Sequence, residues 1–267
     1  MTTLVGALVV AGDAEVTRAG DDFLSGYCRA AASDLTPLEA NGLLCDCSGW
    51  TALDLTPLVH VTSVGDQFLH GCSRLTTLDL TPLAQVTSVG DQFLHGCSRL
   101  TALDLTPLAQ VTRVGDCFLN CCSAVTLLDL TAIGHLTKVG HAFLSDCWAV
   151  SAVDLTPLAH LTTVGKCFLA RCPGLTALDL TPLAHLTCVG REFLCGCTGL
   201  SALDLTPLAH VTSLGKCFLA RCSGLTALEL TSPMLRAPAG GFTSLVVQEL
   251  SVTDVSVPRW SCSRMRV

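Results

Sequence analysis

The sequence is poor in charge and has no long apolar run. Only 14% of its 267 residues are charged, and acidic residues outnumber basic ones by 22 to 15, which leaves a net charge of -7. A nucleic acid or an anionic membrane requires a basic surface, so the composition argues against both partners. No apolar stretch reaches the roughly 18 residues of a membrane span. Half of the residues are hydrophobic, and this excludes a disordered chain.

Motifs of known catalytic and nucleotide sites are also missing. The sequence contains no phosphate loop, nucleophile elbow, His-Glu-x-x-His or dinucleotide fingerprint. Its Asp, His and Cys residues recur as equivalent copies, whereas an active site is normally a unique cluster. We therefore predict a protein that is not an enzyme and that has no cofactor.

A strict repeat is present instead. The stretch Leu53-Asp54-Leu55-Thr56-Pro57-Leu58 returns every 25 residues. The first position of its later copies is Leu78, Leu103, Leu128, Val153, Leu178, Leu203 and Leu228. A period in this range is typical of a solenoid. We predict three parts: degenerate N-terminal repeats or a cap (1–52), seven regular repeats (53–227), and a degenerate last repeat with a C-terminal cap (228–267).

Each repeat predicts one coil of the solenoid. Leu78 and Leu80 lie on one side of a short strand, because strand side chains alternate, and Pro82 ends it. An extended or irregular arm follows. Phe93, Leu94, Cys97 and Leu100 then have the spacing of one face of a short helix, about two turns long. We expect an α/β solenoid of about ten coils with a parallel sheet on one face and short helices or irregular arms on the other, roughly 45–50 Å long.

The two ends of the chain are less regular. Beyond Leu228 the repeat decays, and the sequence places Asp254-Val255 in the column of Asp54-Leu55. The N-terminal apolar stretch is either a short signal-peptide core, which here lacks an opening Lys or Arg, or a degenerate first strand at Leu8-Val9-Val10.

The repeat resembles the leucine-rich repeat superfamily and, more narrowly, its BspA-like (Treponema-type) class. The segment Cys97-Ser98-Arg99-Leu100-Thr101-Ala102-Leu103-Asp104-Leu105 carries the resemblance, together with Pro107, Val111-Thr112-Arg113-Val114-Gly115 and Phe118. The resemblance covers about residues 16 to 258. It implies a protein that acts by binding and that is often surface-associated or adhesive.

An acidic residue recurs in the middle of each predicted strand. This column contains Asp54, Asp79, Asp104, Asp129, Asp154, Asp179, Asp204 and Glu229. It is either a surface that receives a basic partner or cations, or a solvated face whose acids came along with duplication. Like charges across neighbouring strands repel one another, so we expect a raised pKa for some of these acids.

A second column changes sign along the chain, on the side opposite to the strands. It contains Asp21, Asp66, Asp91, Asp116, His141, Lys166, Arg191 and Lys216, and Arg171 and Arg221 add to its basic end. The alternatives are drift on a solvated face and an electrostatic gradient that orients an elongated partner or pairs two copies end to end.

Cysteine and histidine form columns too. Eight of the 17 cysteines form a ladder on a predicted buried face: Cys47, Cys72, Cys97, Cys122, Cys147, Cys172, Cys197 and Cys222. We expect packed, unbridged thiols there, because stacked coils give parallel Cβ vectors that suit disulfides badly. The histidine column His135, His160, His185 and His210 is expected at the surface. A metal or redox sink is the weaker alternative.

The sequence thus predicts a non-catalytic protein–protein interaction scaffold, with an exported structural or adhesive repeat protein as the alternative. Its partner is another protein, and end-to-end self-association is an open option. The unbridged cysteines favour an intracellular location, whereas the family resemblance favours the cell surface.

Overall fold

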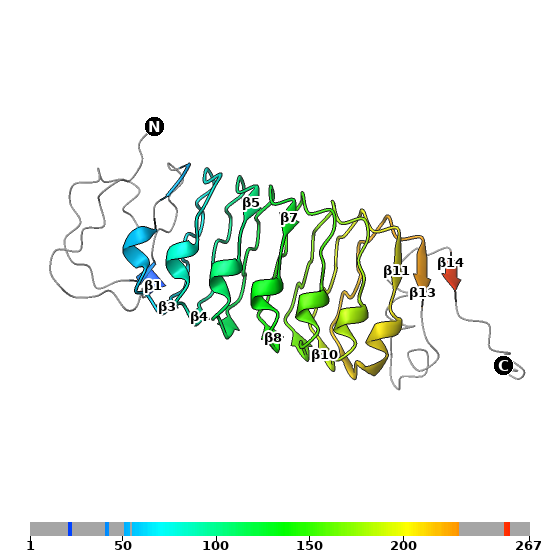
Figure 1. Ribbon diagram of the computed structural model, residues 1–267. Helices are drawn as coiled ribbons and strands as arrows, with labels where there is room; N and C mark the ends of the chain where they lie inside the picture. The colour runs from blue at the N-terminus through cyan, green and yellow to red at the C-terminus, as the bar shows by residue number, and fades with distance from the viewer. Residues whose placement is uncertain (1–20, 23–40, 43–50, 54, 230–253, 257–267) are drawn as a thin grey trace, which may run out of the picture.

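A computed structural model describes residues 21–22, 41–42, 51–53, 55–229 and 254–256. Between residues 55 and 229 the chain winds into coils that stack side by side along one axis and form an elongated body (Figure 1). Short parallel strands pair each coil with the next at a separation of 25 residues, for example Ser88 with Arg113. The predicted solenoid with parallel strands and irregular arms is therefore confirmed, whereas the number of coils stays a prediction.

The predicted strand line is present, and a second strand line accompanies it. The first comprises β5 (Ala102–Leu103), β7 (Leu127–Leu128), β11 (Ala202–Asp204) and β13 (Ala227–Glu229). The second comprises β3 (Ser63–Val64), β4 (Ser88–Val89), β6 (Arg113–Val114), β8 (Lys138–Val139), β9 (Thr163–Val164), β10 (Cys188–Val189) and β12 (Ser213–Leu214). The second line lies where the sequence predicted only an extended arm.

Short 3-10 helices follow the first strand line. They are η2 (Thr56–Leu58), η3 (Thr81–Leu83), η4 (Thr106–Leu108), η5 (Thr131–Ile133), η6 (Thr156–Leu158), η7 (Thr181–Leu183) and η8 (Thr206–His210). All but η5 have proline in the first turn, where its missing N–H is not needed and its fixed φ suits a helix. The proline that ends each strand thus also starts the helix.

The helix predicted over Phe93–Leu100 is wrong. This stretch consists of turns, in which Gln92, Leu94 and Gly96 have positive φ of 61°, 55° and 75°. Left-handed residues turn the backbone amides toward neighbouring coils: the Gln92 N–H donates to the Asp116 carbonyl at 2.7 Å and the Leu94 N–H to the Phe68 carbonyl at 2.9 Å. Apolar spacing alone cannot distinguish such turns from a helix. We call the equivalent segments, from residues 66–72 to 216–222, the turn arm.

A continuous core runs through the stacked coils. One fully buried phenylalanine per coil, from Phe68 to Phe218, forms a column of parallel rings whose centroids lie 5.4–5.7 Å apart. One coil cannot bury these rings alone, so each coil depends on its neighbours. The corner glycines allow close stacking, because a Cβ on Gly90 would lie 2.6 Å from the backbone nitrogen of Asp66.

The last described strand corrects the predicted register. Strand β14 (Asp254–Ser256) pairs in parallel with β13, and Val255 lies beside Leu228. Asp254 thus pairs with Ala227 rather than with Glu229, so the final coil is two residues longer than the repeat. A two-residue shift preserves the alternation of strand faces, which is why the sequence pattern did not reveal it.

Near the other end, β1 (Asp21–Asp22) pairs antiparallel with β2 (Asn41–Gly42), unlike the parallel strands of the body. The segment Leu8-Val9-Val10 lies outside the described residues. The three-part division of the chain stays a prediction.

Candidate interaction surfaces

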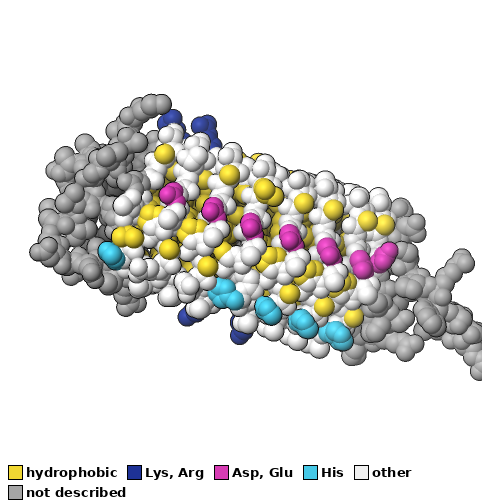
Figure 2. All heavy atoms as spheres, viewed as in Figure 1, with side chains coloured by type: hydrophobic (Ala, Val, Ile, Leu, Met, Phe, Trp, Pro, Cys, Tyr) yellow, Lys and Arg dark blue, Asp and Glu magenta, His cyan; other side chains and the backbone are white. Residues whose placement is uncertain are grey.

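The acidic column forms a single exposed row. Asp79, Asp104, Asp129, Asp154, Asp179, Asp204 and Glu229 are all exposed, whereas Asp54 lies outside the described residues. Figure 2 shows the acidic side chains as one line along the body, with a parallel line of histidines. The four columnar histidines, His135, His160, His185 and His210, are exposed as expected.

Each aspartate of this row is held in the same way. The N–H of the residue two positions later donates to its Oδ1, as from Thr106 to Asp104 and from Thr131 to Asp129, both at 2.8 Å. This bond orders the turn that leads into each 3-10 helix. The second carboxylate oxygen takes no part in it. In the described part of the chain, no lysine or arginine forms an ion pair with this row.

For five aspartates of the row, the expectation of a raised pKa is wrong. The pKa values of Asp79, Asp104, Asp129, Asp154 and Asp179 lie below the usual range. Hydrogen bonding by the side chain and then the backbone of the following threonine is the main cause, and it outweighs repulsion by the neighbouring acids. These five carboxylates are therefore charged at neutral pH.

The sign-changing column connects neighbouring coils. Oδ1 of Asp66, Asp91 and Asp116 accepts the backbone N–H of Asp91, Asp116 and His141, at 2.6–2.7 Å. Nδ1 of His141 accepts the Lys166 N–H at 2.8 Å. Lysine and arginine have no acceptor for this role, so Lys166, Arg191 and Lys216 place exposed cations at the same positions. Asp21 belongs to β1, and its side chain is not described.

The turn arm differs between its two halves. In the N-terminal half, the rings of His70 and His95 stack with centroids 4.9 Å apart. Asn120 and Ser145 are buried at the two following equivalent positions. In the C-terminal half, that column continues as Ala170, Cys195 and Ala220, which form a small separate apolar cluster.

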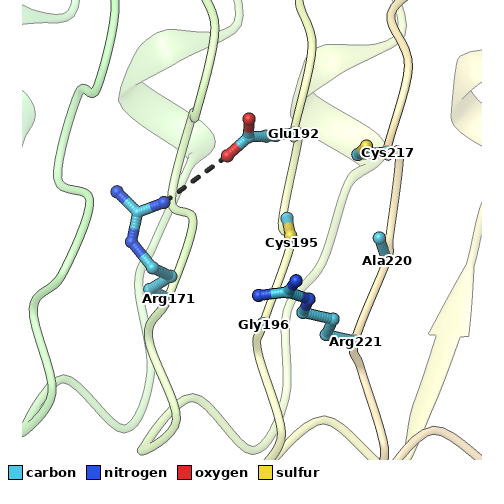
Figure 3. A pocket seen from close by; sticks show the side chains of 7 residues that line it. All are labelled: Arg171, Glu192, Cys195, Gly196, Cys217, Ala220 and Arg221. Atoms are coloured by element: carbon cyan, nitrogen blue, oxygen red, sulfur yellow. Dashed lines mark hydrogen bonds and ion pairs between the residues drawn. The ribbon is translucent and has the colours of Figure 1, made fainter.

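An ion-pair network lies at the junction of the halves. Arg171 donates to both carboxylate oxygens of Asp146, at 2.8 and 2.9 Å, and to Glu192 at 3.4 Å. The hydrogen bond to Asp146 raises the pKa of Arg171. Beyond this network lies a cavity of about 420 Å³ lined by residues of three successive coils, among them Arg171, Cys195 and Arg221 (Figure 3). We did not predict this cavity from the sequence. A signal was present, because Gly196 lies between Arg171 and Arg221 at equivalent positions of successive repeats.

The ladder cysteines are buried from Cys72 to Cys222, and those from Cys97 onward are free thiols; Cys47 lies outside the described residues. Six of them, from Cys97 onward, direct Sγ at a leucine carbonyl of the preceding coil, 3.0–3.3 Å away. Burial raises the pKa of Cys147 and of Cys222 to about 12, so these thiols are neutral packing groups. No cluster of three or more His, Cys, Asp or Glu suited to a metal occurs among the described residues.

None of the helices in the described ranges is long and apolar enough to cross a membrane.

A family model described as the BspA type leucine rich repeat region (6 copies) matches residues 44–176 and 137–254. No curated protein matches the chain by sequence.

Solved structures of repeat proteins resemble the fold. A leucine-rich repeat protein from Bacteroides ovatus is 18% identical over 83% of this chain and 66% of its own length, with a TM-score of 0.52. The functional domain of InlJ from Listeria monocytogenes, which includes a cysteine ladder, is 21% identical over 72% of this chain and 53% of its own, with a TM-score of 0.28. A leucine rich cell surface protein from Faecalibacterium prausnitzii is 15% identical over 86% of both chains, with a TM-score of 0.27.

The chain thus spans about two thirds of the Bacteroides protein and about half of the Listeria domain. At these identities the Bacteroides structure supports the fold alone.

Proposed function

We propose that this chain, which belongs to the BspA type leucine-rich repeat family, is a non-catalytic scaffold that binds a basic, extended segment of a partner protein along its acidic row. The supporting observation is the repetition of one carboxylate geometry in successive coils. Each aspartate from Asp79 to Asp204 is exposed and accepts the same backbone hydrogen bond.

The charge of the row supports a cationic partner. The hydrogen bonds hold the carboxylates at about one strand spacing, roughly 4.8 Å, without neutralising them. Preorganised charge of this kind steers association and sets register. Since successive carboxylates are equivalent, a longer basic segment contacts more of them. Binding is therefore multivalent.

A charge-removal variant tests the proposal. The triple variant is Asp104→Asn, Asp129→Asn and Asp154→Asn. It retains an oxygen acceptor for each backbone hydrogen bond but removes three charges. Binding of a labelled 12-residue lysine-rich peptide is measured by fluorescence anisotropy at two salt concentrations. We expect affinity to fall about tenfold in the triple variant, since each exposed charge pair contributes about 0.2–1 kcal/mol.

The matched control is Asp66→Asn, Asp91→Asn and Asp116→Asn, which removes three charges from the turn arm and also retains an acceptor. It is expected to bind the peptide as the parent protein does. Equal losses in the two triple variants, or no peptide binding by the parent, would contradict a specific role of the row.

The exported adhesive protein is the second candidate. Identical repeated sites favour it, because adhesion relies on many weak contacts. Intact mass of the protein from its source separates the two: a trimmed N-terminus supports export, and an untrimmed one with 17 alkylated cysteines supports an intracellular scaffold.

A further inference from the structure

The cavity in the C-terminal half of the turn arm has a charged rim and a small apolar interior. Arg171 and Glu192 lie on one side, and Arg221 reaches toward them from a coil further along (Figure 3). Cys195 lies beside Arg221, on the coil between those of the two arginines (Figure 3). With a volume of about 420 Å³, the cavity falls within the range of small-ligand sites.

Gly196 opens the space between the arginines. It occupies the same column as Asp146, Arg171 and Arg221, which all adopt left-handed φ of 54–59°. The backbone at this column therefore accepts large side chains in the conformation that Gly196 has, with φ of 76°. A Cβ on Gly196 would approach Cγ of Arg171 to 3.3 Å. The missing side chain at Gly196 thus leaves room beside Arg171.

The two guanidinium groups differ in their surroundings. Arg171 is engaged by both oxygens of Asp146 and by Glu192. Arg221 is exposed and forms no ion pair within the described ranges. Arg191 and Lys216, which directly precede the lining residues Glu192 and Cys217 in the sequence, are further exposed cations. The cavity lining therefore contains one guanidinium, that of Arg221, without an ion pair in the described ranges.

We propose that this cavity binds a carboxylate group carried on a short apolar stem, with Arg221 as the residue that binds the charge. A guanidinium matches a carboxylate in a bidentate geometry. Cys195, Cys217 and Ala220 supply apolar walls for the stem. The carboxylate of Glu192 in the lining disfavours a dianion such as phosphate, so the ligand carries a single negative charge.

This site lies outside the acidic row and does not depend on the proposed function. The ligand is either a free short-chain acid or an acidic side chain of a peptide. Two probe pairs separate these sources: hexanoate with hexanamide, and acetyl-Ala-Glu-Ala-amide with its Gln counterpart. Binding to the full chain is measured by isothermal titration calorimetry, with inorganic phosphate as a further probe.

Two variants locate the binding. Arg221→Gln removes the charge, and we expect affinity for the carboxylate probe to fall about tenfold or more, because hydrogen bonds to charged groups are the strong ones. Gly196→Asn, which tolerates positive φ, fills the cavity and gives a similar loss. Its matched control is Gly96→Asn, at the equivalent position of the N-terminal half with φ of 75°, and this variant binds like the parent.

A chemical readout accompanies the titration. Cys217 is half-buried in the lining, and a bound ligand slows its alkylation, as followed by peptide mapping. The site is supported if a carboxylate probe of either source binds, if its binding is weakened in both Arg221→Gln and Gly196→Asn, and if it protects Cys217 from alkylation. Absence of carboxylate binding, binding unchanged in both variants, equal binding of the amide probes, or tighter binding of phosphate overturns it.

Discussion

The two halves of the turn arm share one backbone but have different surfaces. From Asp66 to Ser145 the arm presents acids that accept amide hydrogen bonds from the next coil, together with half-buried His and buried Asn and Ser side chains. From Lys166 to Arg221 it presents cations above Ala and Cys, and a cavity opens between the arginines. Positive φ at the same three positions in each coil persists throughout. Coil stacking therefore tolerates wide variation here, and the variation created two distinct surfaces.

The core beneath both halves is uniform, and this can be tested by Phe118→Ala and Phe193→Ala. Both rings are fully buried and stacked on two neighbours. We expect each variant to lose about 3–5 kcal/mol of unfolding free energy, from lost burial and cavity formation. Urea unfolding followed by circular dichroism measures both. Losses that differ by more than about 2 kcal/mol would show that the halves differ in their cores as well, beyond the usual spread for such sites.

The hydrogen-bond column predicts a smaller contrast. Asp116→Ala removes the acceptor of the His141 N–H and is expected to cost about 1 kcal/mol, the usual contribution of such a bond. Asp116→Asn retains an acceptor and costs less. Arg191→Ala, at the equivalent basic position, is expected to change stability by less than about 0.5 kcal/mol. Equal losses from Asp116→Ala and Arg191→Ala, measured by urea unfolding, would remove the contrast.

The stacked histidines predict the smallest effect, a pH dependence of the N-terminal half. Burial and then the charge of His70 lower the pKa of His95 below its usual 6.5, and no hydrogen-bond partner for its Nδ1 lies among the described residues. Below about pH 6.5 the unfolded chain binds a proton that folded His95 resists, so stability falls as pH drops toward the lowered pKa.

The variant His95→Asn is expected to reduce this loss of stability, as measured by thermal unfolding between pH 7.5 and 5. Asparagine is chosen because Asn120 occupies the equivalent position of the next coil. His160→Asn, in the exposed column, controls for removal of one histidine and is expected to retain the loss. An unchanged pH dependence in His95→Asn would contradict the assignment.

Much of the architecture could be predicted from the sequence, because each coil repeats the same apolar positions. The 25-residue period and the alternation of strand side chains are enough to predict the inward columns of Leu, Val, Phe and Cys. They also predict the strand that ends at Pro82. The helix over Phe93–Leu100 was mispredicted, since its apolar spacing fits a turn arm equally well. The register of β14 was missed because a two-residue shift leaves the pattern in step. Exposure of the acidic row agrees with its strand position, but its lowered pKa values depend on hydrogen bonds that no spacing reveals.

The sequence by itself determined that the chain is a leucine-rich repeat solenoid, because only stacking can bury one apolar set per coil. Only the tertiary structure decided how the turn arm is used. Residues 25 apart in sequence, such as Arg171 and Gly196, become neighbours there, and their side chains meet across coils. Contacts between coils decide whether an acid accepts the backbone N–H of the next coil and whether a glycine opens a cavity beside an arginine. The aligned sequences of the repeats do not show these contacts.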